Sequence, residues 1–132
     1  KIMNEKKIIQ IAANTNFYGL KDNCSFKIKA TNKICGDQIA VEIDKNFNFM
    51  RYESQSCIFT QASASILANN FTKIYRYGLK NVLKYIKKKL NGESANLPFK
   101  IKEMDVLVNK QNKNRKECIT LPYDAILKIT ND

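Results

Sequence analysis

The sequence predicts an α+β fold in which helices pack on one face of a three-stranded antiparallel sheet. Two observations carry this prediction: apolar residues recur with a period of two in residues 26–52, and they recur at helical spacing on both sides of that segment. Strands in one block and helices in another are typical of α+β folds. At 132 residues, of which 44% are hydrophobic, the chain is long enough to bury one core, so we expect a single domain over residues 1–132.

The sheet is expected from three short runs that follow one another along the chain. Their inward-facing residues are Phe26, Ile28 and Ala30 in the first run, Ile39, Val41 and Ile43 in the second, and Phe47 and Phe49 in the third. The third run continues through Tyr52. Because short polar turns separate the runs, we expect each strand to pair antiparallel with its neighbour, as in a β-meander.

Helices are expected where apolar residues recur every three or four positions. The expected helices cover residues 4–13, 62–71, 79–90, 101–108 and 120–129. Thr60 or Gln61 opens the second of these helices. The last helix begins near Thr120 and Pro122, which are both common helix-start residues.

Composition excludes several classes of function. No apolar run approaches the ~20 residues of a transmembrane helix, so we expect no membrane partner. Residues 1–7 lack the apolar stretch of a secretory signal, which favours a cytoplasmic location and makes disulfides unlikely. The chain has no histidine, so histidine-ligated metals are excluded, and a thiol enzyme that used Cys57 or Cys118 would lack the usual base. A thiol enzyme is therefore the lowest-ranked of the candidate functions.

Lysines dominate the charge of the chain. Lysine and arginine together number 23 against 12 acidic residues, which gives a net charge of +11. Such a cation is attracted to any polyanion, so a basic nucleic-acid-binding domain with structural cysteines is an alternative function. Arginine, which most often reads guanine, occurs only at Arg51, Arg76 and Arg115. No zinc-finger, RNA-binding or helix-turn-helix pattern is present, so solvated lysines explain the charge more simply and nucleic acid is not an expected partner.

The four cysteines have two interpretations. Cys24, Cys35, Cys57 and Cys118 lack the two close pairs of a zinc ribbon. On spacing alone they are small hydrophobic residues of the core. Their local surroundings favour metal binding instead, because three of them are expected at loops or helix starts where a thiolate is accessible and stabilised.

Asp37 and three of the cysteines form the candidate metal site. Cys35 stands in the loop Cys35-Gly36-Asp37, which places a carboxylate two residues from the thiol. Cys57 and Cys118 are each expected just before a helix, whose positive N-terminal end lowers the pKa of a thiol. If the fold brings them together, three sulfurs and one carboxylate oxygen make a four-ligand site for zinc or an iron–sulfur cluster.

These motifs resemble the IscU/NifU N-terminal/SufU family of iron–sulfur cluster assembly scaffolds, in its SufU-like or NifU-like branch. The matching segments are Cys35-Gly36-Asp37, Ser56-Cys57 with residues 61–67, and residues 115–118 with residues 121–125. The resemblance implies a SufE/NifU-like α+β fold and a site built from Cys35, Asp37, Cys57 and Cys118. It also implies that a cysteine desulfurase supplies sulfur as a persulfide to Cys35 or Cys118, and that iron then joins this sulfur. The resulting transient 2Fe–2S cluster, or zinc in its place, is held at the site. The cluster is then transferred to acceptor apo iron–sulfur proteins.

The chain departs from the family pattern at several positions. Glu117 stands where the IscU branch has histidine, and it either ligates through oxygen or is exposed, the second being favoured. Ser56 replaces a glycine, and the chaperone-binding Leu-Pro-Pro-Val-Lys segment is absent. Cys24 matches no family position and is expected to be inert. Asp37 is a hard oxygen ligand among soft sulfurs, so it holds iron or zinc less firmly than a fourth thiolate, as a transient site requires.

Overall fold

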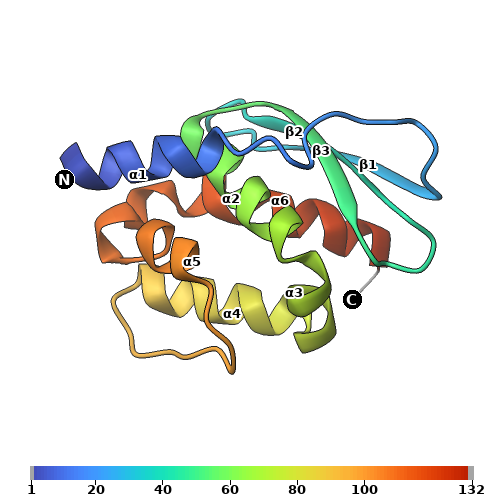
Figure 1. Cartoon of the computed structure of the whole chain (residues 1–132). Helices are drawn as coiled ribbons and strands as arrows, with labels where there is room; N and C mark the ends of the chain where they lie inside the picture. The colour runs from blue at the N-terminus through green and yellow to red at the C-terminus, as the bar shows by residue number, and fades with distance from the viewer. Residues whose placement is uncertain (1, 131–132) are drawn as a thin grey trace.

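The computed structural model describes residues 2–130. A helix comes first, three strands follow, and the remaining helices complete the chain (Figure 1). The elements are α1 (Ile2–Ala12), β1 (Phe26–Thr31), β2 (Gln38–Ile43), β3 (Met50–Gln55), α2 (Ile58–Asn69), α3 (Phe71–Tyr77), α4 (Leu79–Leu90), α5 (Lys102–Leu107), the 3-10 helix η1 (Lys110–Arg115) and α6 (Lys116–Thr130). Among these described residues, no helix has both the length and the apolar character that crossing a bilayer requires.

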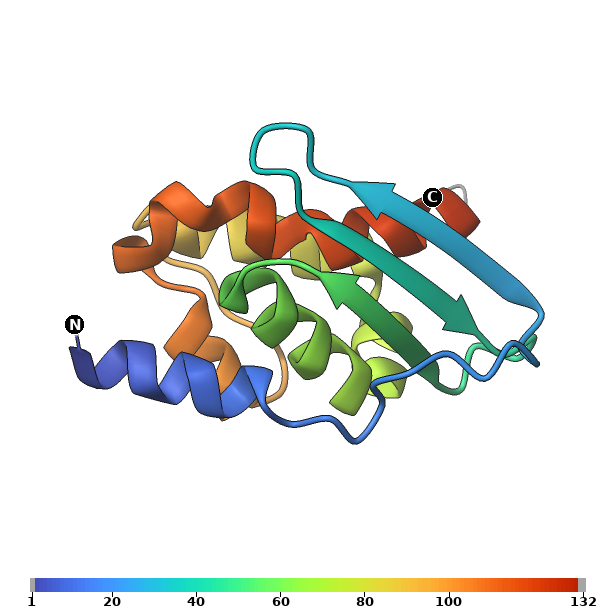
Figure 2. The same ribbon diagram turned by 90° about the horizontal axis from the view of Figure 1, so that it is seen from above.

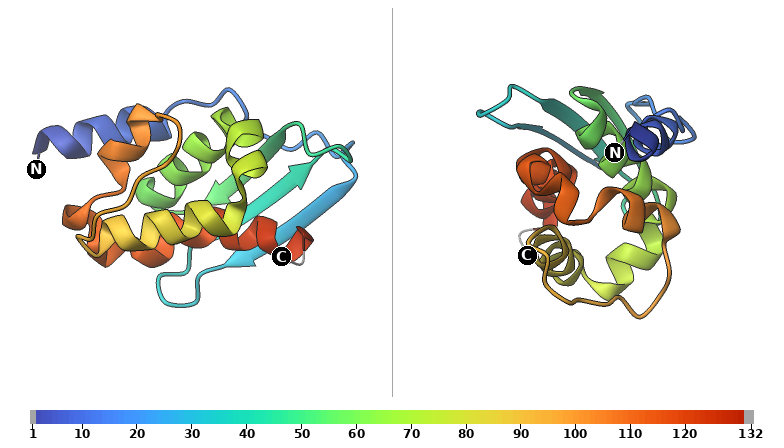
Figure 3. Two further views of the ribbon diagram at one scale, coloured as in Figure 1. Left: turned by 90° about the horizontal axis from the view of Figure 1, so that it is seen from below. Right: turned by 90° about the vertical axis from the view of Figure 1, so that its left-hand side faces the viewer.

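The central strand of the sheet is β2, which pairs antiparallel with β1 on one side and β3 on the other. Val41 of β2 pairs with both Ile28 and Tyr52, and this row belongs to the face that is turned toward the helices. Helix α6 packs on β1 and β2, while α2 packs on β3 (Figures 1 and 3). The predicted α+β fold with a three-stranded antiparallel sheet is confirmed.

The third strand differs from its prediction in its first residue and in which of its side chains face the core. It begins at Met50 rather than at Phe47, and its buried residues are Met50 and Tyr52. Phe49, which was predicted to face inward, is 40% exposed. Since side chains alternate along a strand, this one-residue difference in phase reverses the predicted faces of the strand.

The turn before β3 explains the difference. The Asp44 carboxylate accepts hydrogen bonds from the backbone N–H groups of Asn48 (2.6 Å) and Phe49 (3.0 Å), which holds residues 44–49 in a turn. Phe47 adopts a positive φ of 56°, incompatible with a strand. Its ring instead stacks on Tyr75 with a centroid separation of 4.8 Å. Phe47 is therefore a turn residue that packs on a helix.

Residues predicted as one helix through Phe71 form two. Helix α2 ends at Asn69, and α3 starts at Phe71. Between them, Asn70 has non-helical backbone angles and donates its side-chain amide to the carbonyl oxygen of Ile66 at 2.8 Å. Asparagine side chains compete with the backbone for hydrogen bonds in this way, so the helix is interrupted at Asn70.

A buried carboxylate fixes the segment that connects α1 to β1. Glu42 of β2 points away from the helices but is fully buried, and it accepts hydrogen bonds from the backbone N–H groups of Lys21 (2.6 Å) and Asp22 (3.1 Å). Arg51 of β3 donates to the carbonyl oxygen of Gly19 at 2.7 Å. A buried charge requires such partners, so the connecting segment covers this part of the outer face.

Candidate metal centre

Three cysteines from separate parts of the chain meet at one end of the sheet. Cys35 and Asp37 lie in the loop between β1 and β2, Cys57 is the N-cap residue of α2, and Cys118 lies in the first turn of α6. The view from above shows that this loop projects beyond the strands, beside the start of α2 and the first half of α6 (Figure 2).

The ligand atoms of these residues lie close together. The Sγ atoms of Cys35 and Cys118 are 3.7 Å apart, and together with a carboxylate oxygen of Asp37 they all lie within 4.8 Å of one another. The Sγ of Cys57 is 3.3 Å from Asp37 Oδ2, so it joins the cluster through Asp37. The structure therefore brings together all four predicted site residues, Cys57 at the margin of the group.

Burial differs sharply between the members of this cluster. Cys118 is 4% exposed and Asp37 is 6% exposed, whereas Cys35 is exposed to solvent. Soft sulfur and hard oxygen donors without histidine suit zinc or iron. The cluster is thus closed on the side of α6 and open on the side of the β1–β2 loop.

The Asp37 carboxyl is held in its charged form. Burial raises its pKa, but hydrogen bonds from Thr60, Cys57 and Cys35 outweigh the burial, and the net pKa lies below the usual value. The nearest donor, the Thr60 hydroxyl, is 2.7 Å from Oδ2, and the backbone N–H of Cys57 is 3.2 Å from Oδ1. The carboxylate, which is the form that binds a cation, is therefore present without any metal.

Cys118 departs from the sequence prediction, which placed it just before a helix with a lowered pKa. Burial raises the pKa of its thiol, and the neighbouring Cys57, Cys35 and Asp37 raise it further. Helix α6 begins at Lys116, so Cys118 lies inside its first turn rather than before it. Since a metal binds the thiolate, metal binding here must release a proton.

The position of Pro122 is one way in which α6 differs from its prediction. The sequence predicts that Pro122 lies near a helix start, but the structure places it inside α6. Proline has no N–H, so the carbonyl oxygen of Cys118, four residues earlier, lacks its usual helical donor. That carbonyl oxygen is instead 3.0 Å from the hydroxyl of Thr60 on α2. Pro122 therefore leaves a backbone carbonyl next to the cluster without its helical donor, and the Thr60 hydroxyl takes the place of that donor.

Thr60 links the two sides of the site. Its hydroxyl is fully buried and lies between Asp37 Oδ2 and the carbonyl oxygen of Cys118, both of which can accept its single proton. One turn further along α2, Ser63 donates to the carbonyl oxygen of Ile119 at 2.5 Å. The sequence predicted only that Thr60 or Gln61 opens this helix, whereas α2 begins at Ile58 and Thr60 lies in its first turn. Its spacing of three residues from Cys57 was the available signal.

We expect Thr60→Val to weaken metal binding by about tenfold, because outer-shell partners orient the ligands of a metal site. The substitution keeps the side-chain shape but removes the hydroxyl that contacts Asp37 and Cys118. It should also lower the free energy of unfolding by about 1–3 kcal/mol, since buried acceptors lose a donor. Competition with a zinc chelator measures the affinity, and urea unfolding measures the stability.

Thr72→Val is the matched control. The Thr72 hydroxyl donates to the carbonyl oxygen of Asn48 in the turn before β3, an exposed contact that involves no cysteine. It should leave zinc affinity unchanged. Equal affinities for Thr60→Val and wild type would show that Thr60 does not orient the ligands.

Glu117 and Cys24 lie outside the cluster. Glu117 is exposed, as the favoured interpretation predicted, and is absent from the described group of metal-binding atoms. Cys24 precedes β1, near Glu42 and Asp44 and so at the opposite end of the sheet, and burial raises the pKa of its thiol.

The rim of the cluster carries apolar and cationic side chains. Ile34, next to Cys35, is 84% exposed, which is unusual for an aliphatic residue. Beside α2, the guanidinium of Arg115 lies over the ring of Phe59, 5.1 Å from its centroid. An aliphatic side chain is therefore exposed next to Cys35, and Arg115 is held over a ring of α2 two residues after Cys57.

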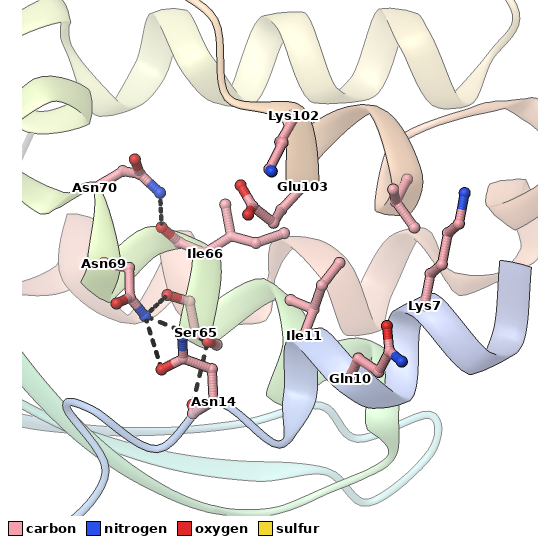
Figure 4. A pocket seen from close by; sticks show the side chains of 11 residues that line it. Lys7, Gln10, Ile11, Asn14, Ser65, Ile66, Asn69, Asn70, Lys102 and Glu103 are labelled. Carbon is pink, nitrogen blue, oxygen red and sulfur yellow. Dashed lines mark hydrogen bonds between the residues drawn. The ribbon is translucent and has the colours of Figure 1, made fainter.

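A pocket lies elsewhere, between α1, α2 and α5 (Figure 4). Its volume is about 740 Å³, and Ile11 and Ile66 project into it among amide side chains. The amides of Asn69 and Asn70 already bond to carbonyl oxygens of α2. The pocket contains no cysteine, so its chemistry is separate from that of the cluster.

Comparison with solved structures identifies the fold. No family model matches the chain. A protein assigned as an iron–sulfur cluster assembly scaffold for the SUF system, from Fervidobacterium islandicum, superposes with a TM-score of 0.74 at 18% identity, covering 94% of this chain and 93% of that one. A nitrogen-fixing NifU-like protein (N-terminal part) from Brucella abortus gives 0.75 at 19% identity, covering 96% and 90%. A hypothetical protein gives 0.78 at 14% identity, covering 99% and 98%.

A relative of known sequence is also similar over most of its length. An uncharacterized protein of Borreliella burgdorferi is 30% identical over 129 residues, which covers 92% of this chain and 85% of that protein. Identity at this level and coverage indicates common descent, while the lower identities to the scaffold structures establish the shared fold. The chain therefore belongs to the family of the Borreliella burgdorferi protein, and its fold is that of the SufU and NifU-like scaffold proteins.

Proposed function

We propose that this protein is a scaffold for iron–sulfur cluster assembly. In this role Cys35, Asp37, Cys57 and Cys118 together hold a transient 2Fe–2S cluster, or zinc in its place. The observation that supports it most directly is the approach of two sulfurs and one carboxylate oxygen to within 4.8 Å, with a third sulfur 3.3 Å from that carboxylate. The cluster is cargo: it is built on the chain and passed to an apo iron–sulfur protein.

The composition of the ligand set suits transfer better than storage. Three thiolates bind iron or zinc strongly, but the oxygen of Asp37 is a harder ligand and dissociates more readily. Cys35 lies on an exposed loop, so a competing thiolate of an acceptor protein reaches the cluster from that side. The cargo is therefore held firmly on the buried side and loosely on the open side.

Cys35 is the sulfur acceptor in this proposal. The sequence left Cys35 and Cys118 as alternatives. Cys118 is only 4% exposed, whereas Cys35 is open to solvent. A desulfurase must bring its own persulfide into contact with the receiving thiol, so accessibility favours Cys35.

The proposed partners are a cysteine desulfurase and acceptor apo-proteins. A net charge of +11 accelerates encounter with a desulfurase that presents an acidic surface, and a salt titration of complex formation tests this point. The role also requires a reducing compartment such as the cytoplasm, because Cys35 and Cys118, whose sulfurs are 3.7 Å apart, must be in the thiol form whenever a metal binds.

Anaerobic reconstitution tests the proposed function. With ferrous iron, sulfide and a dithiol, the chain should develop the visible absorption of a 2Fe–2S centre, and with zinc it should bind about one ion per chain. Cys24→Ser should load as the wild type does, since Cys24 lies at the other end of the sheet. Failure to bind either metal, together with salt-sensitive binding to DNA or RNA, would favour the nucleic-acid alternative instead.

A further inference from the structure

We propose that the Cys35–Cys118 pair releases sulfide from a persulfide in a single turnover that itself uses no external reductant. This activity rests on the proposed function, because it begins from a persulfide on Cys35. Cluster assembly needs sulfide, whereas a persulfide carries sulfur that is more oxidised by two electrons. In this proposal the two thiol sulfurs of the chain supply those electrons.

The geometry of the pair supports this reaction. Cys118 Sγ lies 3.7 Å from Cys35 Sγ, near van der Waals contact for two sulfurs, and their exposure is opposite. Cys35 is open to a sulfur donor, whereas Cys118 is 4% exposed and is shielded from the donor. The donor therefore loads Cys35, and the buried thiol stays available as the attacking group.

The reaction is a thiol–disulfide exchange in which the S–S bond of the persulfide takes the place of the disulfide bond. Cys118 Sγ attacks Cys35 Sγ, the bond between Cys35 Sγ and the terminal sulfur breaks, and a Cys35–Cys118 disulfide forms. The terminal sulfur leaves with the bonding electron pair and its own hydrogen, takes up the proton of the Cys118 thiol and departs as H₂S. The terminal sulfur is reduced by two electrons, and the two cysteine sulfurs are oxidised by two.

The position of Cys118 favours attack on the inner sulfur. In the structure, Cys118 Sγ contacts Cys35 Sγ itself, which becomes the inner sulfur once Cys35 carries a persulfide. The terminal sulfur extends from an exposed residue, so the leaving group departs into solvent. The third thiol, Cys57, contacts Asp37 Oδ2 at 3.3 Å, and no hydrogen-bond contact joins it to Cys35 among the described residues.

Each turnover consumes the thiol pair. The disulfide removes two of the proposed metal ligands, so a dithiol reductant must reopen it before a metal binds. Sulfide release and metal binding are therefore successive states of one site. They can be measured separately, because release requires no metal.

The test uses the metal-free full chain. The reduced protein is treated anaerobically with inorganic polysulfide, desalted, and incubated without thiols while sulfide is trapped with a bimane reagent. Wild type should release about one sulfide per persulfide formed and accumulate a Cys35–Cys118 disulfide, identified by peptide mass spectrometry. Cys118→Ser should still be persulfidated but release sulfide about tenfold more slowly. Cys24→Ser should behave as wild type.

Three outcomes would overturn the proposal: a stable persulfide in the wild type, transfer of the terminal sulfur to Cys118 without sulfide release, or a disulfide between Cys35 and Cys57. Circular dichroism verifies that Cys118→Ser is folded, and Cys118→Ala provides a second variant that lacks the thiol. Zinc binding is measured on the same reduced preparations. If zinc binds but no sulfide appears, the scaffold function stands and the release activity fails. If neither occurs, both fail.

Discussion

Replacing Cys118 with serine should reduce zinc affinity by roughly 100-fold. Structural zinc sites bind with about 10–16 kcal/mol over four ligands, so one ligand contributes about 3 kcal/mol. Cys118 is the buried member of the cluster, and its Sγ lies within 4.8 Å of both Cys35 Sγ and an Asp37 oxygen. A serine hydroxyl is a poor substitute for a thiolate, and water cannot easily reach the vacated position. Chelator competition measures the affinity.

The same substitution should also prevent the formation of a stable cluster during reconstitution. Cys24→Ser is the matched control, because it removes one thiol near Glu42 and Asp44 and leaves all four proposed ligand residues in place. Zinc affinity that is unchanged in Cys118→Ser would remove this residue from the ligand set and contradict the proposed site.

Asp37→Cys should make the bound cluster persist about tenfold longer in the presence of a chelator. The substitution replaces the hard oxygen ligand with a fourth soft thiolate, which binds iron more firmly. The decay of the visible absorption after addition of the chelator measures the lifetime. Transfer to an apo-acceptor should slow by a similar factor, because the weakest ligand is then gone.

Gln38→Cys is the control for an added thiol. Gln38 is adjacent to Asp37 in the chain but is the exposed first residue of β2, outside the described group of ligand atoms. It should leave the lifetime unchanged. A cluster that is no more persistent in Asp37→Cys than in Gln38→Cys would show that Asp37 does not limit the stability of the cargo.

The fold follows from sequence periodicity where one pattern dominates. The first two strands alternate strictly, and α4 carries an apolar stripe opposite its lysines, so both were predicted correctly. The third strand was predicted with the wrong face because Phe47 and Phe49 also alternate and favour strands. The side-chain contacts of Asp44 decided the outcome, and period alone does not show whether an aspartate will hold a turn.

The sequence pointed to the candidate residues that the structure brings together, but it did not reveal the contacts around them. Cys35 and Asp37 share one loop, and Cys57 precedes a helix as predicted, so local context was sufficient for these residues. The pKa of Cys118 was predicted in the wrong direction, because burial depends on how α6 packs against distant segments. The bridging role of Thr60 depends on the free carbonyl that Pro122 creates four residues before itself. Contacts of this kind between distant helices have no signature along the chain.

Under the proposed function, the exposed side chain of Ile34 favours a sulfur donor that presents an apolar surface. It stands immediately before Cys35 and is 84% exposed, so a donor surface that covers this loop also displaces water from an aliphatic side chain. Covering an isoleucine yields about 2 kcal/mol, and this contribution is insensitive to ionic strength. Complex formation with a sulfur donor should therefore retain a salt-resistant fraction of its affinity, even after counterions have screened the attraction due to the lysines.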